Sequence, residues 1–256
     1  MHAPAFIKAI WYQFDDFPME TLTKIWYFHK PIEKKQRDVS LMKEHREQFG
    51  SSGNCFDLAI WLLDECKKNG IRAYAIGHDL FSLNGHIAVV MEDKYQYLCD
   101  LGDQWIEPVL ISPESDDFSN QWLTGFFPGA QVKIHRLQSL LLVSYLRPNG
   151  KITNQTYDLT PIDTDTLWQA AEWSQNHIKP RALVECRIPY QQEIAHWEYN
   201  NGTAFLSTSI GKLNEESALS ISEATNRIVH YANMDESFVY NALRSYERLS
   251  PTLWKP

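Results

Sequence analysis

Several features that would place this chain in a specialised class of protein are missing from it. Its four cysteines, at positions 55, 66, 99 and 186, include no CxxC pair, so neither a disulfide framework nor a zinc site is predicted. No apolar run approaches the roughly eighteen residues of a membrane span. The first residues also lack a signal-peptide pattern. We therefore expect a cytoplasmic protein with reduced thiols, no metal and no membrane partner.

A concentrated positive charge is also missing. The net charge is −8, and the longest basic cluster is the short run EKKQR at 33–37. Binding to a phosphate backbone requires a basic footprint, so no nucleic-acid partner is expected. Apolar residues make up 44% of the chain and aromatic residues 13%, spread along its length. A chain of 256 residues with this composition can bury a substantial core.

The stretch SSGNCFDLAIWLLDEC, from Ser51 to Cys66, joins a turn to a helix. Small residues lead into Cys55, and apolar residues then recur at helical spacing until the stop signal at Gly70. Cys55 would stand at the amino end of this helix, where unpaired N–H groups and the helix dipole favour a thiolate over a thiol. Most free cysteines are core fillers, but a thiolate in this place is a candidate nucleophile.

Hydrophobic periodicity predicts an α+β fold in three parts. These are an N-terminal helical bundle (1–70) that carries Cys55, a central antiparallel β-barrel or sheet (71–160), and a C-terminal α/β lid (161–256). Residues 104–129 are expected to form a loop with a short helix. The expected helices are 18–30, 39–48, 55–68, 163–176, 215–232 and 235–249, and the expected strands are 71–76, 86–91, 95–100, 131–137, 140–146, 151–158, 181–188 and 192–206, the last broken by a turn at 201–202.

The hairpin formed by strands 86–91 and 95–100 brings two titratable residues together. A three-residue loop at 92–94 pairs Met91 with Tyr95 and sets His86 opposite Asp100. Directly opposed residues share a face of the sheet, whereas a slip of one residue would separate them. An imidazole and a carboxylate are therefore predicted to be neighbours.

Cys55, His86 and Asp100 then occur in the Cys-His-Asp order of a thiol acyl-transfer enzyme. In that chemistry, His86 takes the thiol proton, while Asp100 fixes the tautomer of the imidazole and stabilises its charged form. Each residue also has an ordinary structural interpretation, as a core, surface or turn residue. Cys66 and Cys99 are predicted to serve only packing, and His78 and Asp103 are the nearest substitutes for the histidine and the carboxylate.

The segments GNCFDLA, GHIAVVMED and YQYLCDLG resemble the arylamine N-acetyltransferases, whose signature is roughly RGGxCFE, a THxxLxV strand and YLVDVGFG. The helix METLTKIWYFHK, the segment from 157 to 188 and the final helices are similar to the same family, so the resemblance covers nearly the whole chain. It implies that Cys55 accepts an acetyl group from acetyl-CoA as a thioester. An amine-type small molecule would then attack this thioester in a ping-pong cycle, with His86 and Asp100 as activating partners. Backbone N–H groups around Cys55 would stabilise the oxyanion.

The chain departs from this family pattern next to the candidate nucleophile. The Arg-Gly of the signature is Ser51-Ser52 here, and the aromatic residue before the cysteine is Asn54. The phenylalanine that lines the acceptor pocket of the family is Asp103, which suits a cationic or polar acceptor better than an aryl ring. Asn54, Phe56 and Asp103 are the residues predicted to contact substrate.

Two other functions compete with acyl transfer. The order Cys-His-Asp and the strand GIRA at 70–73 are also typical of transglutaminase-like or peptidase-like thiol enzymes, although these usually have an aromatic residue after the histidine, where this chain has Ile87. The altered residues beside Cys55 are compatible with a binding protein built on the same scaffold.

Overall fold

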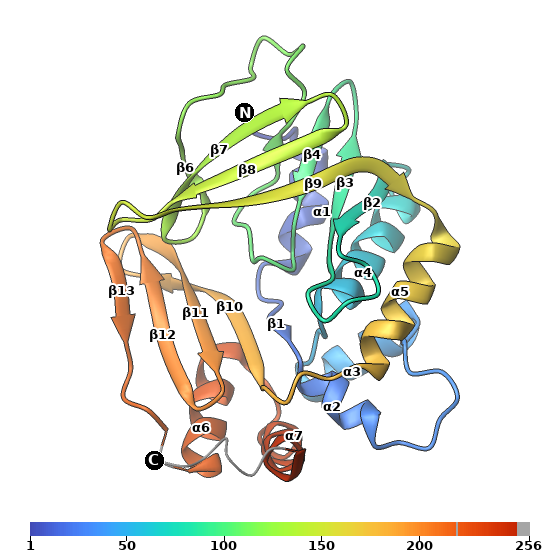
Figure 1. The fold of residues 1–256 in the computed structure, drawn as a ribbon, viewed down its shortest axis with the longest axis vertical. Coiled ribbons are helices and arrows are strands. Elements are labelled where there is room, and N and C mark those ends of the chain that lie inside the picture. The colour runs from blue at the N-terminus through green and yellow to red at the C-terminus, as the bar shows by residue number, and fades with distance from the viewer. Residues whose placement is uncertain (219, 250–256) are drawn as a thin grey trace.

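The computed structural model describes residues 1–218 and 220–249, which form two sheets flanked by helices (Figure 1). The larger sheet lies in the upper part of the view, with helices α1 (Ala5–Trp11) and α4 (Cys55–Lys68) beside it. The smaller sheet lies below, together with α6 (Ile221–Ala232) and α7 (Glu236–Leu249). This arrangement confirms the predicted α+β fold, whereas the division of the chain at residues 70 and 160 stays a prediction.

The predicted helices at 39–48, 55–68, 163–176 and 235–249 are confirmed as α3 (Val39–Phe49), α4, α5 (Thr164–Asn176) and α7. The first turns of α3 and α5 are capped by aspartates, because Asp38 accepts a hydrogen bond from the Leu41 N–H and Asp163 accepts one from the Thr166 N–H. Such caps satisfy N–H groups that have no partner within the helix.

The helix predicted from Pro18 is wrong at its beginning. Helix α2 spans only Leu22–Phe28, and the preceding Met19–Glu20 form the short strand β1, paired with β10 (Leu183–Tyr190). Glu20 is fully buried, and its backbone N–H donates to the carbonyl of Gly53. These long-range contacts override the local helical pattern.

The larger sheet is antiparallel and nearly closed, with the strand order β5-β4-β3-β2-β9-β8-β7-β6. The loop region 104–129 contains the strands β5 and β6 and, among its residues, no helix, so the short helix predicted there is wrong. The bounds of the eight strands are β2 Arg72–His78, β3 His86–Glu92, β4 Gln96–Cys99, β5 Val109–Leu110, β6 Leu123–Phe127, β7 Ala130–Leu137, β8 Leu140–Leu146 and β9 Ile152–Ile162.

The hairpin β3–β4 forms as predicted, but its register differs by two residues. Met91 pairs with Tyr97 rather than with Tyr95, so the turn lies at 93–95. Side chains alternate between the two faces of a strand, so a shift of two residues keeps every side chain on its predicted face. His86 and Asp100 therefore remain on one face, as diagonal rather than opposed neighbours.

The smaller sheet has the order β1-β10-β11-β12-β13. Its remaining strands are β11 (Glu193–Asn200), β12 (Thr203–Thr208) and β13 (Gly211–Asn214), so the predicted turn at 201–202 is confirmed. Helix α6 begins at Ile221 rather than at Glu215, because the Glu215 N–H bonds to the Ala204 carbonyl and its carboxylate accepts the Trp197 indole N–H. The predicted helix 215–232 also includes Leu219, which lies outside the described residues.

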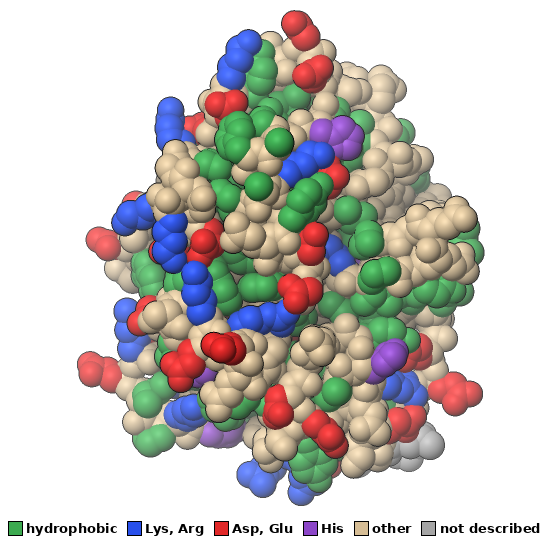
Figure 2. Space-filling view, turned by 180° about the vertical axis from the view of Figure 1, so that it is seen from behind, with side chains coloured by type: hydrophobic (Ala, Val, Ile, Leu, Met, Phe, Trp, Pro, Cys, Tyr) green, Lys and Arg blue, Asp and Glu red, His purple; other side chains and the backbone are tan. Residues whose placement is uncertain are grey.

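Two buried apolar clusters correspond to the two sheets. The first joins α1, α4 and the larger sheet, and the second joins α2, the smaller sheet, α6 and α7. Within residues 1–218 and 220–249, no helix is long and apolar enough to cross a membrane. The face shown in Figure 2 carries acidic and basic side chains interspersed with apolar ones, and the expected absence of a nucleic-acid partner stays a prediction.

Candidate active site

Cys55 is the first residue of α4, and a capping box fixes the backbone around it. The Asn54 side chain accepts hydrogen bonds from the N–H groups of Phe56 (2.9 Å) and Asp57 (3.3 Å). In return, the Asp57 carboxylate accepts the Asn54 N–H at 3.0 Å. This reciprocal arrangement holds the first turn rigidly, so the half-buried Cys55 thiol sits at the positive end of a well-ordered helix.

The turn before Cys55 is held by a buried carboxylate and requires glycine. Glu20 accepts the Gly53 N–H at 2.7 Å. Gly53 has a φ of +92°, a conformation that residues with a side chain rarely adopt. A Cβ atom on it would lie 2.3 Å from an Asp57 oxygen and 2.5 Å from an Arg37 nitrogen. The glycine therefore lets the buried pair approach the turn.

That pair is a buried salt bridge between Arg37 and Asp57, whose closest atoms are 3.3 Å apart and whose side chains are each 1% exposed. Arg37 also donates to the Ser52 carbonyl at 3.4 Å. Gln36 and Gln175 donate to the two oxygens of Asp57 at 3.0 Å each, so the buried carboxylate is well satisfied. The loop at 29–38 thus supplies a guanidinium to the turn before Cys55.

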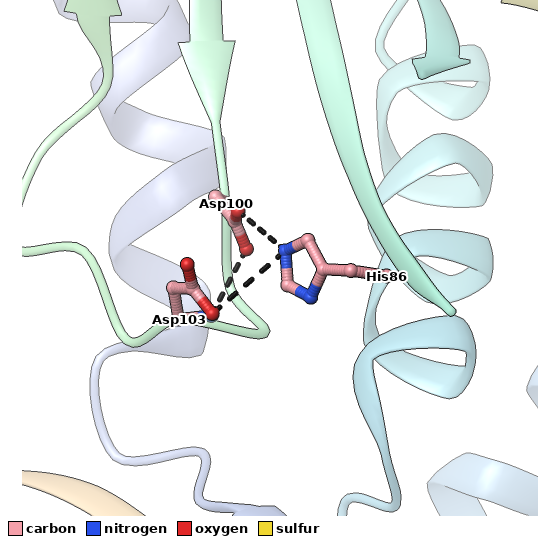
Figure 3. A group of neighbouring side chains, drawn as sticks. All are labelled: His86, Asp100 and Asp103. Atoms are coloured by element: carbon pink, nitrogen blue, oxygen red, sulfur yellow. Dashed lines mark hydrogen bonds and ion pairs between the residues drawn. The ribbon is translucent and has the colours of Figure 1, made fainter. Parts of the chain in front are cut away.

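His86 and Asp100 lie in direct contact (Figure 3). The Nε2 atom of His86 is 2.7 Å from Oδ2 of Asp100, a fully buried carboxylate. The buried Tyr157 hydroxyl donates to the same oxygen at 2.6 Å, and the Asp103 N–H donates to Oδ1 at 2.9 Å. The other ring nitrogen, Nδ1, points away from the carboxylates (Figure 3). The Cys55 thiol lies beside the same ring, and its Sγ donates to the Gly85 carbonyl at 4.0 Å.

These contacts raise the pKa of His86 and lower the pKa of Asp100, and both shifts favour an ion pair between them. Burial lowers the pKa of His86, but the charges of Asp100 and Asp103, the hydrogen bond to Asp100 and the nearby Cys55 thiol together raise this pKa well above its usual value. Burial raises the pKa of Asp100, but His86, the Tyr157 hydroxyl and the Asp103 N–H together lower it. The imidazole is thus arranged to hold a proton next to a sulfur.

Gly102 lies at the point where the three side chains converge. A Cβ atom on Gly102 would lie 2.6 Å from Cβ of Cys55, 2.9 Å from Cε1 of His86 and 3.3 Å from Oδ1 of Asp100. A residue with a side chain would therefore push sulfur, ring and carboxylate apart.

Asp103 is a second carboxylate beside the imidazole. Its Oδ1 lies 3.8 Å from Nε2 of His86, and its side chain is 31% exposed. Burial, together with the charges of Asp100 and Glu185, raises the pKa of Asp103 to about 6, with His86 opposing the shift. His86, Asp100 and Asp103 offer three possible metal ligands within 4.8 Å of one another. Because Asp100 Oδ2 already accepts bonds from His86 and Tyr157, we interpret the group as a hydrogen-bonded one.

We expect Asp103→Asn to stabilise the protein at pH 8 and to have little effect at pH 4. The folded-state pKa of Asp103, about 6, lies above its unfolded value of 3.8. Its carboxyl therefore keeps its proton longer in the folded state, and it reduces stability as the pH rises through that interval. The gain should be about 1 kcal/mol, reduced for the exposed part of the side chain. Urea unfolding of the wild type and the variant at both pH values measures this gain in stability. An equal gain at pH 4 and pH 8 would contradict the raised pKa of Asp103.

Two hollows open at this site. The first, the Cys55 cavity, measures about 350 Å³ and is lined by Cys55, His86 and Lys24 among others. The second, the inter-sheet cleft, measures about 690 Å³ and lies between the β8–β9 end of the larger sheet and strands β11–β13 of the smaller one. Asp103 and Glu185 line both hollows, so the two meet beside the imidazole.

Some of the residues predicted to act in catalysis or binding lie at this site, and others do not. Cys55, His86 and Asp100 come together, and Asp103 lies beside them. Asn54 lines the Cys55 cavity, although its side-chain oxygen caps α4. Phe56 is 2% exposed and packs in the larger core, so it is not at the wall of either hollow. Their roles in catalysis or binding stay predictions.

Sequence reasoning missed four residues that shape the site, namely Lys24, Arg37, Gly102 and Tyr157. Gly102 follows Asp100 in the YQYLCDLG segment, and a glycine two residues after a candidate catalytic carboxylate is a signal of close packing that was available. The others come from distant parts of the chain and carry no local signal. Cys66 and Cys99 are buried, as predicted for packing residues.

The fold of this chain is similar to that of several solved structures. No protein-family model matches the sequence, and no curated protein matches it. Arylamine N-acetyltransferase from Salmonella typhimurium superposes with a TM-score of 0.68 and 11% identity, covering 96% of this chain and 93% of that one. The Nocardia farcinica enzyme superposes with a TM-score of 0.71 and 13% identity, covering 96% of this chain and 87% of that one. The Mycobacterium marinum enzyme, solved in complex with CoA, superposes with a TM-score of 0.67 and 8% identity, covering 92% of this chain and 90% of that one. The chain thus shares the arylamine N-acetyltransferase fold.

Proposed function

We propose that the protein is an N-acyltransferase that moves an acetyl or other acyl group from acyl-CoA, as co-substrate, to a small-molecule amine through a thioester on Cys55. The observation that carries the proposal is the convergence of a helix-terminal thiol and an imidazole at the wall of one cavity, with a fully buried carboxylate bonded to the imidazole from behind. The shared fold supports it, as does the CoA bound to the Mycobacterium marinum neighbour. A cytoplasmic location, where acyl-CoA is available, belongs to the same proposal.

In the first half-reaction, His86 takes the proton of the Cys55 thiol, and the thiolate attacks the acyl carbon. The bond between this carbon and the CoA sulfur breaks, and the CoA thiolate leaves with the proton from His86. Asp100 keeps the ring in the tautomer whose free nitrogen faces Cys55, and it stabilises the imidazolium. The N–H groups of Phe56 and Asp57 already bond to the Asn54 side chain, which leaves the Cys55 N–H at the start of α4 as the donor to the oxyanion.

In the second half-reaction, the amine nitrogen attacks the thioester carbon and His86 takes its proton. The carbon–sulfur bond breaks, the amide leaves, and Cys55 recovers its proton. An alkyl amine is protonated near neutral pH, whereas an aryl amine is not. The bound ammonium must therefore first release one proton to water, and the neutral amine then attacks and gives its second proton to His86. A carboxylate such as Asp103 beside His86 is suited to attract the cationic form, so we propose a cationic or polar acceptor rather than an aryl one.

Incubation with acetyl-CoA followed by intact-mass measurement tests the proposal. We expect one acetyl group on the wild-type protein, none on Cys55→Ala, and an unchanged adduct on the matched controls Cys66→Ala and Cys99→Ala. Release of the adduct by added amines would complete the cycle. If acetyl-CoA leaves no adduct while iodoacetamide labels Cys55 rapidly, a transglutaminase-like or peptidase-like enzyme is indicated. Alkylation as slow as that of a free peptide thiol would indicate a binding protein.

A further inference from the structure

The wall of the Cys55 cavity carries three cations that the proposed mechanism does not use. Lys24 of α2 is half-buried, whereas Lys179 and Arg181, from the segment before β10, are exposed; all three line this cavity. Among the described residues, no ion pair between a basic side chain and a carboxylate involves any of the three. A half-buried ammonium without a counterion is costly, so a ligand that supplies the missing charge would be bound favourably.

Lys24 is tied to the nucleophile helix. Its Nζ donates to the Ser174 hydroxyl at 3.3 Å, and the Asn54 side-chain amide donates to the same oxygen at 3.4 Å. Asn54 is the residue that caps α4 directly before Cys55. Burial lowers the pKa of Lys24 to about 8, while Cys55 and Asp57 oppose this shift and Lys179 adds to it. The ammonium is therefore mostly charged at neutral pH, close to the sulfur.

The carboxylates of the same cavity each lie next to a histidine. Asp103 is 3.8 Å from His86, and Glu185 is 3.4 Å from His196. Both stand where the cavity meets the inter-sheet cleft. The Cys55 cavity thus offers positive charge at Lys24 and negative charge at Asp103, with the sulfur at the same wall.

We propose that Lys24, with Lys179 and Arg181, forms an anion-binding subsite that receives a negatively charged group of the acyl donor next to Cys55. The subsite itself is independent of acyl transfer; only the identification of its ligand as an acyl donor rests on the proposed function. The charged group is either a carboxylate on the acyl chain or a phosphate of the carrier. The acyl carboxylate would reach Lys24 directly, since the phosphates of CoA lie a long pantetheine arm away from the thioester.

Alkylation of Cys55 by two reagents that differ in charge tests the subsite. Iodoacetate and iodoacetamide both react by attack of sulfur on the CH₂ carbon with loss of iodide, so the ratio of their rates does not depend on the thiolate fraction. Relative to the same ratio for a free peptide thiol, we expect wild-type Cys55 to favour iodoacetate by about tenfold, equivalent to about 1.4 kcal/mol. Added salt should reduce this preference.

Variants at position 24 assign the preference to the ammonium. We expect Lys24→Met to lower the ratio severalfold, Lys24→Arg to keep most of the preference, and the exposed Lys67→Met to change nothing. Circular dichroism checks that each variant is folded. A wild-type ratio equal to that of the free thiol, or an unchanged ratio in folded Lys24→Met, overturns the proposal. A wild-type ratio equal to that of the free thiol overturns the proposal even if a variant does not fold. Because a charged His86 ring would also favour iodoacetate, a raised ratio is assigned by the variants; if Lys24→Met does not fold, the exposed Lys179→Met and Arg181→Met take its place, and an unchanged ratio in both overturns the proposal.

Four donors identify the source of the charge. Succinyl and butyryl groups have the same four-carbon chain and differ in the terminal group, a carboxylate or a methyl. Each is attached either to CoA or to the uncharged carrier N-acetylcysteamine. If succinyl donors acylate Cys55 faster than butyryl donors on both carriers, and Lys24→Met loses this difference, the subsite binds the acyl carboxylate. If CoA donors acylate faster than N-acetylcysteamine donors with both acyl groups, and Lys24→Met loses this difference, the subsite binds phosphate. Acylation by the donors without any dependence on charge overturns the proposal. If no donor acylates Cys55, the proposed function fails, while the alkylation ratio still decides whether the subsite exists.

Discussion

Asp100→Asn is expected to slow acylation of Cys55 by about 10⁴-fold, the order of loss seen when the carboxylate of a catalytic triad becomes an amide. The buried carboxylate accepts three hydrogen bonds, from His86, the Tyr157 hydroxyl and the Asp103 N–H. An asparagine can present its oxygen to only one side. If its NH₂ group faces His86, the ring must accept at Nε2 and carry its proton on Nδ1, so that it no longer can take the thiol proton.

Single-turnover acylation by acetyl-CoA, followed by mass, measures this loss. Tyr157→Phe is the matched control, because it removes one hydrogen bond to the same oxygen and leaves the carboxylate in place. Loss of one such bond to a charged group costs about 2 kcal/mol, so we expect a decrease of about 30-fold or less. A rate for Asp100→Asn within tenfold of the wild type would show that Asp103, 3.8 Å from the same nitrogen, acts as the carboxylate partner instead.

The predicted neighbourhood of His86 and Asp100 did not depend on the exact pairing of their hairpin. The sequence indicated two alternating strands and a short turn, which fix the face of each side chain but not the register. The structure shifts the turn from 92–94 to 93–95 and the pairing by two residues. Since side chains alternate with a period of two, an even shift preserves the contact and an odd one would have destroyed it.

Sequence reasoning could not predict the structural features that depend on contacts between residues far apart in the sequence. Met19–Glu20 form a strand because β10 pairs with them, and the buried carboxylate of Glu20 then holds the turn at Gly53. Arg37 stands in a loop with no regular pattern, and only the fold brings it to Asp57. Local periodicity carries no signal for such pairs, whereas it was sufficient for the helix that begins at Cys55.

Lys24 shows the same limit for a candidate functional residue. In the sequence it is one polar position of an amphipathic helix, where solvent exposure is the usual outcome. The structure instead places it against the Ser174 hydroxyl and at the wall of the Cys55 cavity. A half-buried cation beside a candidate nucleophile therefore becomes visible only when α2, α4 and α5 are seen together.

Gly102→Ala is expected to reduce acylation of Cys55 by at least about 10²-fold, because displacements near 1 Å in a reacting group cost that much. The added methyl group would lie 2.6 Å from Cβ of Cys55 and 2.9 Å from Cε1 of His86. Both distances are shorter than any relaxed carbon–carbon contact, so thiol and imidazole must separate. We expect the protein to remain folded, with a loss of stability of about 1–3 kcal/mol from overpacking.

Gly70→Ala is the matched control for this substitution. Gly70 lies just after α4, the helix that begins at Cys55, and has a φ of +67°. No atom would lie within 4 Å of its added Cβ. It should lose about 1 kcal/mol of stability from backbone strain while acylating at the wild-type rate. Thermal unfolding and single-turnover acylation of both variants separate the two effects. Equal acylation rates in the two would mean that sulfur and imidazole need not touch for the reaction, and the assignment of His86 as the base would then fail.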